Sequence, residues 1–67
     1  MTKSELQQNI YEDVKLYAEH GPMPLKYLSA KYHRTAKPFG GIRAVVHGDE
    51  RLVVRITKTG GLVVSIC

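Results

Sequence analysis

Apolar residues in the first third of the chain recur at intervals of four, four and three positions, which is the spacing of one face of an α-helix. These residues are Leu6, Ile10, Val14 and Tyr17. Gly21 suits a left-handed position after a helix, and Pro22 cannot continue the helical hydrogen bonds. The pattern therefore predicts a helix over residues 4–20.

A second helical pattern begins at Pro24, whose fixed φ suits the first turn of a helix. Three residues follow at intervals of three and four positions: Leu25, Leu28 and Tyr32. This spacing predicts a short helix over about residues 24–33. Residues 33–37 are polar and have no apolar period, so we expect a loop there.

The segment 38–47 fits both a helix and a strand. A helix here would begin at Pro38 and end before Gly48, with an apolar face of Phe39, Ile42, Val45 and Val46. The β-branched residues and the adjacent Gly40 and Gly41 favour a strand, because each glycine costs about 1 kcal/mol inside a helix. We nevertheless favour a helix, because two helices alone do not cover the two-stranded ribbon that follows.

The last part of the chain contains two runs rich in β-branched residues, 51–57 and 62–66, which are separated by a loop with two glycines. This arrangement predicts a β-hairpin. The order of elements predicts one α+β domain over residues 1–67, a winged-helix-like fold of three helices followed by a two-stranded β-hairpin wing. The alternative is two helices on a three-stranded antiparallel meander of residues 42–46, 51–57 and 62–66.

Composition agrees with one small globular domain. With 43% hydrophobic and 24% charged residues, the chain is not typical of a disordered tail. It has no apolar run of about 18 residues that would span a membrane, and no signal-peptide pattern. A single cysteine, Cys67, allows no intrachain disulfide. These features favour an intracellular protein of the cytoplasm or nucleus.

Charge is distributed unevenly along the chain. Residues 1–20 carry two Lys against four carboxylates, a net charge of −2, whereas residues 21–67 carry eight Lys or Arg against two carboxylates, a net charge of +6. Five cations and no carboxylate lie from Lys26 to Arg43, with Tyr27 and Tyr32 among them. A basic region with aromatic residues beside an acidic segment is typical of a domain that binds an anionic partner, most often nucleic acid.

We therefore predict a non-catalytic nucleic-acid-binding domain whose basic patch contacts phosphates and reads few bases. The expected contact residues are Lys26, Tyr27, Lys31, Arg34, Lys37, Arg43, Arg55 and Lys58. The strongest phosphate contacts are expected from Arg34, Lys37 and Arg43, which flank the turn into the third predicted helix. Tyr32 lies at helical spacing and is expected in the core rather than on a base.

Residues 21–32, with the sequence GPMPLKYLSAKY, resemble the junction between the first two helices of the OST-HTH (LOTUS) winged-helix domains. Residues 39–46 are similar to the third helix of that family, and residues 52–66 to its wing. The resemblance is one of apolar pattern and covers residues 4–66. It implies RNA binding in some members and protein binding in others, so we expect RNA somewhat more than DNA.

No pattern typical of an active site is present, so we expect neither an enzyme nor a cofactor. His20, His33, His47 and Cys67 are separated by 13, 14 and 20 residues, which matches no compact zinc spacing. We expect these histidines on the surface.

A second hypothesis is a protein-interaction module that uses an apolar groove or the edge of the hairpin. The strand 62–66 carries no charge, and an uncharged open edge invites strand addition by a partner or a second copy of the chain. The only segment placed to cover it is Met23-Pro24, where the proline lacks an N–H to donate. We therefore expect Val63, Val64 and Ile66 to be available to a protein partner.

Overall fold

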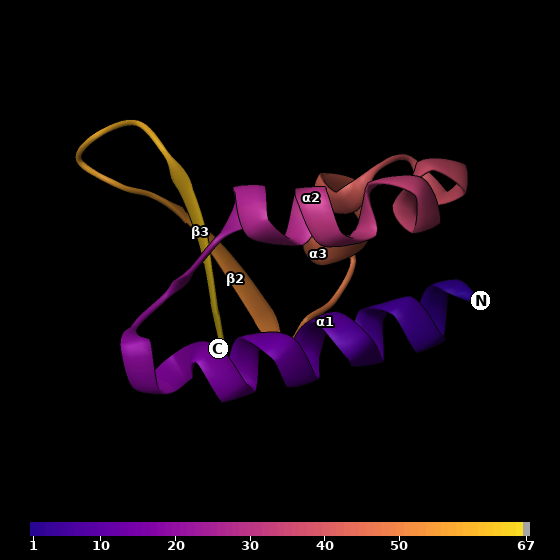
Figure 1. Ribbon diagram of the computed structural model, residues 1–67, viewed down its shortest axis with the longest axis horizontal. Helices are drawn as coiled ribbons and strands as arrows, with labels where there is room; N and C mark the ends of the chain where they lie inside the picture. The colour runs from indigo at the N-terminus through magenta and orange to yellow at the C-terminus, as the bar shows by residue number, and fades with distance from the viewer. Residues whose placement is uncertain (67) are drawn as a thin grey trace.

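Three α-helices and a three-stranded antiparallel sheet make up the computed structural model, which describes residues 1–66 (Figure 1). The elements are α1 (Lys3–Tyr17), β1 (Met23–Pro24), α2 (Leu25–Ala36), α3 (Ile42–His47), β2 (Leu52–Ile56) and β3 (Leu62–Ile66). Short 3₁₀ turns, Ala18–His20 and Lys37–Phe39, follow α1 and α2. The predicted α+β class is confirmed, and three helices precede the β2–β3 hairpin.

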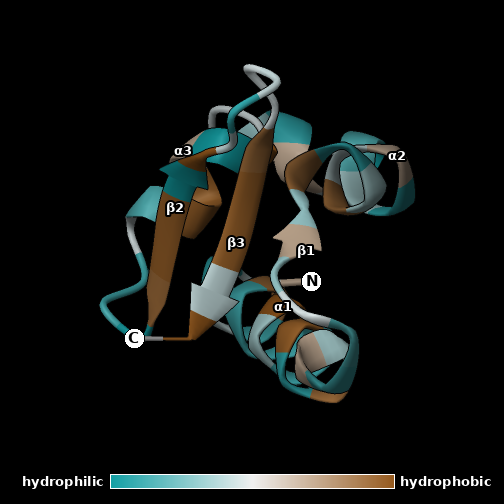
Figure 2. Cartoon of the chain, turned by 90° about the vertical axis from the view of Figure 1, so that its left-hand side faces the viewer, coloured by the Kyte–Doolittle hydropathy of each residue, from teal (hydrophilic) through white to brown (hydrophobic). Residues whose placement is uncertain are grey.

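β3 is the central strand of the sheet, with β1 on one side and β2 on the other (Figure 2). Five residue pairs join β2 to β3. Met23 of β1 lies opposite Val64, and Pro24 lies opposite Val63. The sheet has three strands, as in the alternative meander, but residues 42–46 are helical and β1 supplies the third strand.

The edge predicted to be open at residues 62–66 is covered in part, because β1 pairs with Val63 and Val64. Val64 is fully buried, Val63 is half-buried, and Ile66 is 37% exposed. Pro24 ends a two-residue strand at the edge of the sheet, a position where a missing N–H costs little. Val63 and Val64 therefore do not form an open edge for a protein partner.

α1 begins one residue earlier than predicted because Thr2 caps it. The Thr2 hydroxyl accepts a hydrogen bond from the backbone N–H of Glu5, and the Glu5 carboxylate accepts one from the N–H of Thr2. The predicted apolar face is buried at Leu6, Ile10 and Val14, whereas Tyr17 is half-buried. No helix among residues 1–66 is long and apolar enough to cross a membrane.

α2 extends through residues 33–36, where a loop was predicted. Its backbone does leave the helical conformation at Tyr32, the predicted end, with φ −114° and ψ 18°. The chain then resumes a helical turn that brings Ala36 into the core with no exposed surface. This burial stabilises a turn that has no apolar period of its own.

The third helix is shorter than the predicted segment 38–47, because both glycines lie before it. Gly40 ends the 3₁₀ turn in the left-handed conformation, with φ 94°. Gly41 precedes α3 with φ 95° and ψ 166°, a region that glycine adopts almost exclusively. Neither glycine therefore lies inside a helix, so neither carries the cost of about 1 kcal/mol that favoured a strand in this segment.

The core joins all three helices to the sheet. Its fully or nearly buried members are Leu6, Ile10, Val14, Leu25, Leu28, Ala36, Ile42, Val45, Val46, Leu52 and Val64. In Figure 1, α1 lies below, α2 and α3 lie above, and β2 and β3 run between the two levels. The hairpin tip consequently lies beside α2, on the side of the molecule away from α1.

Candidate nucleic-acid interface

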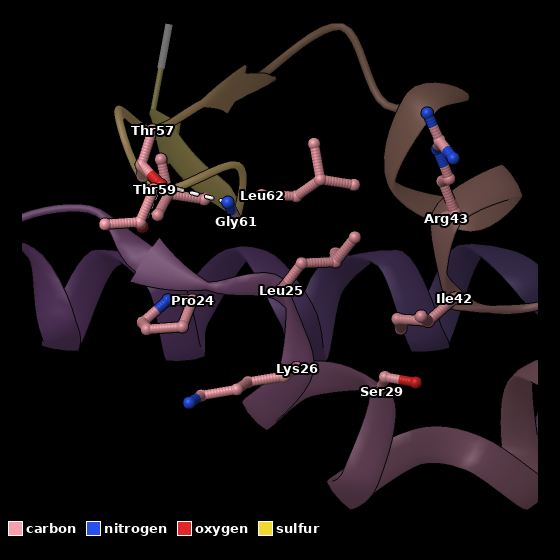
Figure 3. A pocket seen from close by; sticks show the side chains of 11 residues that line it. Pro24, Leu25, Lys26, Ser29, Ile42, Arg43, Thr57, Thr59, Gly61 and Leu62 are labelled. Atoms are coloured by element: carbon pink, nitrogen blue, oxygen red, sulfur yellow. Dashed lines mark hydrogen bonds between the residues drawn. The ribbon is translucent and has the colours of Figure 1, made fainter.

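A groove of about 610 Å³ lies between the start of α2, the start of α3 and the tip of the β2–β3 hairpin (Figure 3). Its lining residues are Pro24, Leu25, Lys26, Ser29, Ile42, Arg43, Thr57, Thr59, Gly61, Leu62 and Val63. A second hollow of about 520 Å³ continues from it along α2 and adds His33, Lys37, Gly40 and Gly41. The two share Ser29, Ile42 and Arg43. We call these two hollows together the basic groove.

The basic groove is positively charged along its length. Lys26 lies in its first part, Lys37 in its second, and Arg43 in both. No Asp or Glu is among the residues that line it. An anion that enters the groove therefore meets cations without a competing carboxylate.

The floor of the groove is apolar. Leu25 and Ile42 are buried, and Leu62 is half-buried. Figure 3 shows Leu25 and Leu62 pointing toward one another, with the charged ends of Lys26 and Arg43 at the periphery. The groove thus offers apolar contact in its middle and positive charge at its margins.

The carboxylates lie on the other side of the molecule. Four of the six belong to α1 and the turn that follows it: Glu5, Glu12, Asp13 and Glu19. The other two, Asp49 and Glu50, lie between α3 and β2. Figures 1 and 2 both place α1 opposite the hairpin tip. The acidic N-terminal segment and the basic groove therefore lie on opposite sides of the folded chain.

Lys31 and Tyr32 face α1 rather than the groove. The Lys31 ammonium lies 3.0 Å from an Asp13 carboxylate oxygen, and the Tyr32 hydroxyl donates a hydrogen bond to the same oxygen. Burial, and then the hydrogen bond to Asp13, raise the pKa of Tyr32. Lys31 was predicted as a nucleic-acid contact, but its charge is already paired. Tyr32 is half-buried and packs against the core, as expected.

The other predicted contacts are exposed but do not line the groove. Tyr27 is 51% exposed, and the Lys26 ammonium lies 5.7 Å from the centre of its ring. Lys58 lies at the hairpin tip between two lining residues, Thr57 and Thr59. Arg34 and Arg55 are exposed on α2 and β2. Lys58 is therefore beside the groove, whereas Arg34, which was expected among the strongest phosphate contacts, is not one of its lining residues.

Two polar residues that line the groove on α2, Ser29 and His33, were not predicted from the sequence. Ser29, His33 and Lys37 follow Lys26 at intervals of three, four and four residues, so they share one face of the segment that begins with α2. Only the lysines on this face were singled out from charge. The same helical spacing would have identified Ser29 and His33 as their neighbours.

Arg51 carries a positive charge that is bound within the fold. Its guanidinium donates hydrogen bonds of 3.0 and 2.9 Å to Asp49 and one of 2.8 Å to Gln8, and it lies 4.3 Å from the centre of the Tyr11 ring. The hydrogen bonds from Arg51 hold the pKa of Asp49 below its usual value. Arg51 therefore fixes the α3–β2 turn to α1.

No three His, Cys, Asp or Glu side chains gather as metal ligands within residues 1–66. Cys67, the fourth residue weighed as a ligand, lies outside the described part of the chain. No family model matches the chain, and the searches of curated proteins and solved structures found no similar protein. Charge and geometry therefore carry the functional argument.

Proposed function

We propose that this chain is a non-catalytic nucleic-acid-binding domain that holds RNA or DNA in the basic groove. One observation carries the proposal: Lys26, Lys37 and Arg43 line two adjoining hollows without a carboxylate, while four of the six carboxylates belong to α1 and the turn after it. The order of three helices and a hairpin, with the groove between α2, α3 and the hairpin tip, supports binding on the face where these three elements meet.

Phosphate contacts would supply most of the affinity. Each phosphate that a Lys or Arg neutralises releases condensed counterions, so the binding constant falls as salt rises. Three cations in the groove correspond to a slope of about −2 to −3 in a plot of log K against log salt. We therefore expect weak binding that is readily measured only at low salt.

The test is fluorescence anisotropy with labelled RNA and DNA oligonucleotides at about 50 mM salt and above. The double variant Lys37→Gln/Arg43→Gln removes two charges from the groove. Its control, Lys3→Gln/Lys15→Gln, removes two charges from exposed positions on α1. Both pairs change the net charge of the chain equally.

We expect the groove variant to bind at least about tenfold more weakly and its salt slope to fall by about 2, while the control stays close to the unsubstituted chain. Equal losses in the two variants would show that net charge alone drives binding and would contradict the groove. An unsubstituted chain that binds neither RNA nor DNA at low salt would refute the proposed function.

A further inference from the structure

The exposed surface of α3 is too small to read a duplex. The helix has six residues and is about 9 Å long. Ile42, Val45 and Val46 are buried in the core, which leaves Arg43, Ala44 and His47 exposed. Helices that read the major groove present several polar side chains to base edges. One arginine and one histidine give α3 little capacity for that role.

The first part of the basic groove has the properties of a site for an unpaired base. Its volume of about 610 Å³ lies within the range of about 300–1,000 Å³ that holds small organic ligands. Leu25, Ile42 and Leu62 supply apolar surface for the faces of a ring. Ser29 and Thr59 supply hydroxyl groups, which both donate and accept hydrogen bonds and so suit the polar edge of a base.

The cations are placed for the phosphates on either side of such a base. Lys26 comes from α2 and Arg43 from α3, and Figure 3 shows their charged ends at the periphery of the apolar floor. The groove then continues past Arg43 to Lys37 and His33, where the next nucleotides of a strand would lie. A duplex keeps its bases stacked inside and would offer this surface only its phosphates.

From these observations we propose that the basic groove binds single-stranded nucleic acid, with one unstacked base held between Leu25, Ile42 and Leu62. The proposal rests on the function proposed above and names its substrate class. Its signature is a preference for single strands over duplexes. A surface that bound nucleic acid through phosphate contacts alone would prefer duplexes to single strands, because duplex DNA has the higher charge density.

Three DNA ligands compared at equal phosphate concentration test the proposal: an oligothymidine of about 12 nucleotides, an abasic strand of the same length, and a blunt-ended duplex without unpaired bases. We expect the oligothymidine to bind about tenfold more tightly than either of the others, because burial of one base against apolar side chains contributes a factor of about that size. Equal binding of all three would overturn base insertion while leaving the proposed function intact. No binding of these ligands or of an RNA strand of the same length would refute the proposed function itself.

A substitution that fills the groove without changing its charge locates the base. Ser29→Phe adds a ring inside the groove, whereas its neighbour Ala30 is exposed outside it, so Ala30→Phe is the matched control. We expect Ser29→Phe to weaken oligothymidine binding about tenfold and to leave the abasic strand within about twofold, because base contacts are lost and phosphate contacts kept. Ala30→Phe should affect neither ligand.

Thr59→Trp approaches the same space from the exposed hairpin tip and gives a second test if Ser29→Phe lowers the melting temperature. Equal loss of the oligothymidine and the abasic strand in these variants would overturn the proposal. Displacement of oligothymidine by polyglutamate at equal charge concentration would also overturn it, because a polyanion without bases would then suffice.

Discussion

At the scale of single residues, Tyr32 links α2 to α1 through a side-chain hydrogen bond. Its hydroxyl donates a hydrogen bond to Asp13 of α1, and the same carboxylate pairs with Lys31. Tyr32 is also the residue at which the backbone of α2 leaves the helical conformation. The hydrogen bond between the helices and the break in α2 therefore occur at the same residue.

This coupling predicts a loss of stability at high pH. The pKa of Tyr32 is raised above its usual value of 10.0, by burial and then by the hydrogen bond to Asp13, and the hydrogen bond to Asp13 also raises the pKa of Lys31. A group whose pKa rises on folding contributes stability below its unfolded pKa and loses it as pH rises through its folded pKa. We expect the free energy of unfolding to decline above about pH 10.

Tyr32→Phe should make that decline shallower and should cost about 1 kcal/mol at neutral pH, the usual value of one hydrogen bond. Urea denaturation followed by circular dichroism across this pH range measures both effects. Tyr27→Phe is the control, because Tyr27 is 51% exposed. A decline as steep in Tyr32→Phe as in the unsubstituted chain would contradict the assignment.

At the scale of elements, the two glycines before α3 set where that helix begins. Gly41 has φ 95° and ψ 166°, and a Cβ built there meets no atom within 4 Å. Any penalty for a side chain at this position therefore comes from the backbone and not from a clash. Ile42 and Arg43 follow directly, so the geometry at Gly41 places two residues of the basic groove.

Gly41→Ala should therefore lower the free energy of unfolding by about 1–3 kcal/mol. Gly61→Ala is a control at another lining residue, since Gly61 has no positive φ and its added Cβ would lie 3.4 Å from the Thr57 hydroxyl oxygen. Thermal melts of the two variants compare backbone strain with simple addition of a methyl group. Equal stability in the two would contradict the strained conformation.

The elements that the sequence predicted well are those whose signal is local. The face of α1 follows from the spacing of Leu6, Ile10 and Val14, and the hairpin follows from its β-branched runs and glycine loop. The last turn of α2 was missed because it depends on burial of Ala36 against distant residues. β1 was discounted because Pro24 has no N–H to donate to the sheet. Pro24 is nevertheless both the last residue of β1 and the N-cap of α2.

The groove was predictable in its charge but not in its shape. Lys26, Lys37 and Arg43 were selected from the sequence because they lie in a run without carboxylates. Lys31 lies in the same run, but its partner Asp13 is 18 residues away on another helix. Only the packing of α1 against α2 shows which lysines are paired.

At the scale of the whole molecule, eleven residues within the described chain form a small core. A domain of 67 residues typically has a free energy of unfolding of about 3–10 kcal/mol. Because each helix contributes to this one core, a cavity anywhere in the core removes a large share of the free energy of unfolding. The groove, which is built on Leu25 and Ile42, depends on the same core.

Ile10→Ala should therefore cost about 2–5 kcal/mol, because Ile10 is 1% exposed and the change leaves a cavity. Leu16→Ala on the same helix is the control, since Leu16 is 76% exposed and little is lost by truncating it. Thermal unfolding followed by circular dichroism measures both. A similar melting temperature for the two variants would mean that the register of α1 is wrong.

The central position of β3 also constrains the order in which the fold can be completed. Val64 pairs with Met23 across 41 positions of sequence, and Val64 is itself fully buried. During synthesis all three helices leave the ribosome before β3 does, so until residues 62–66 emerge the helices have no central strand to pack on. We therefore expect the nascent domain to remain unfolded until residues 62–66 have emerged and then to fold in one cooperative step.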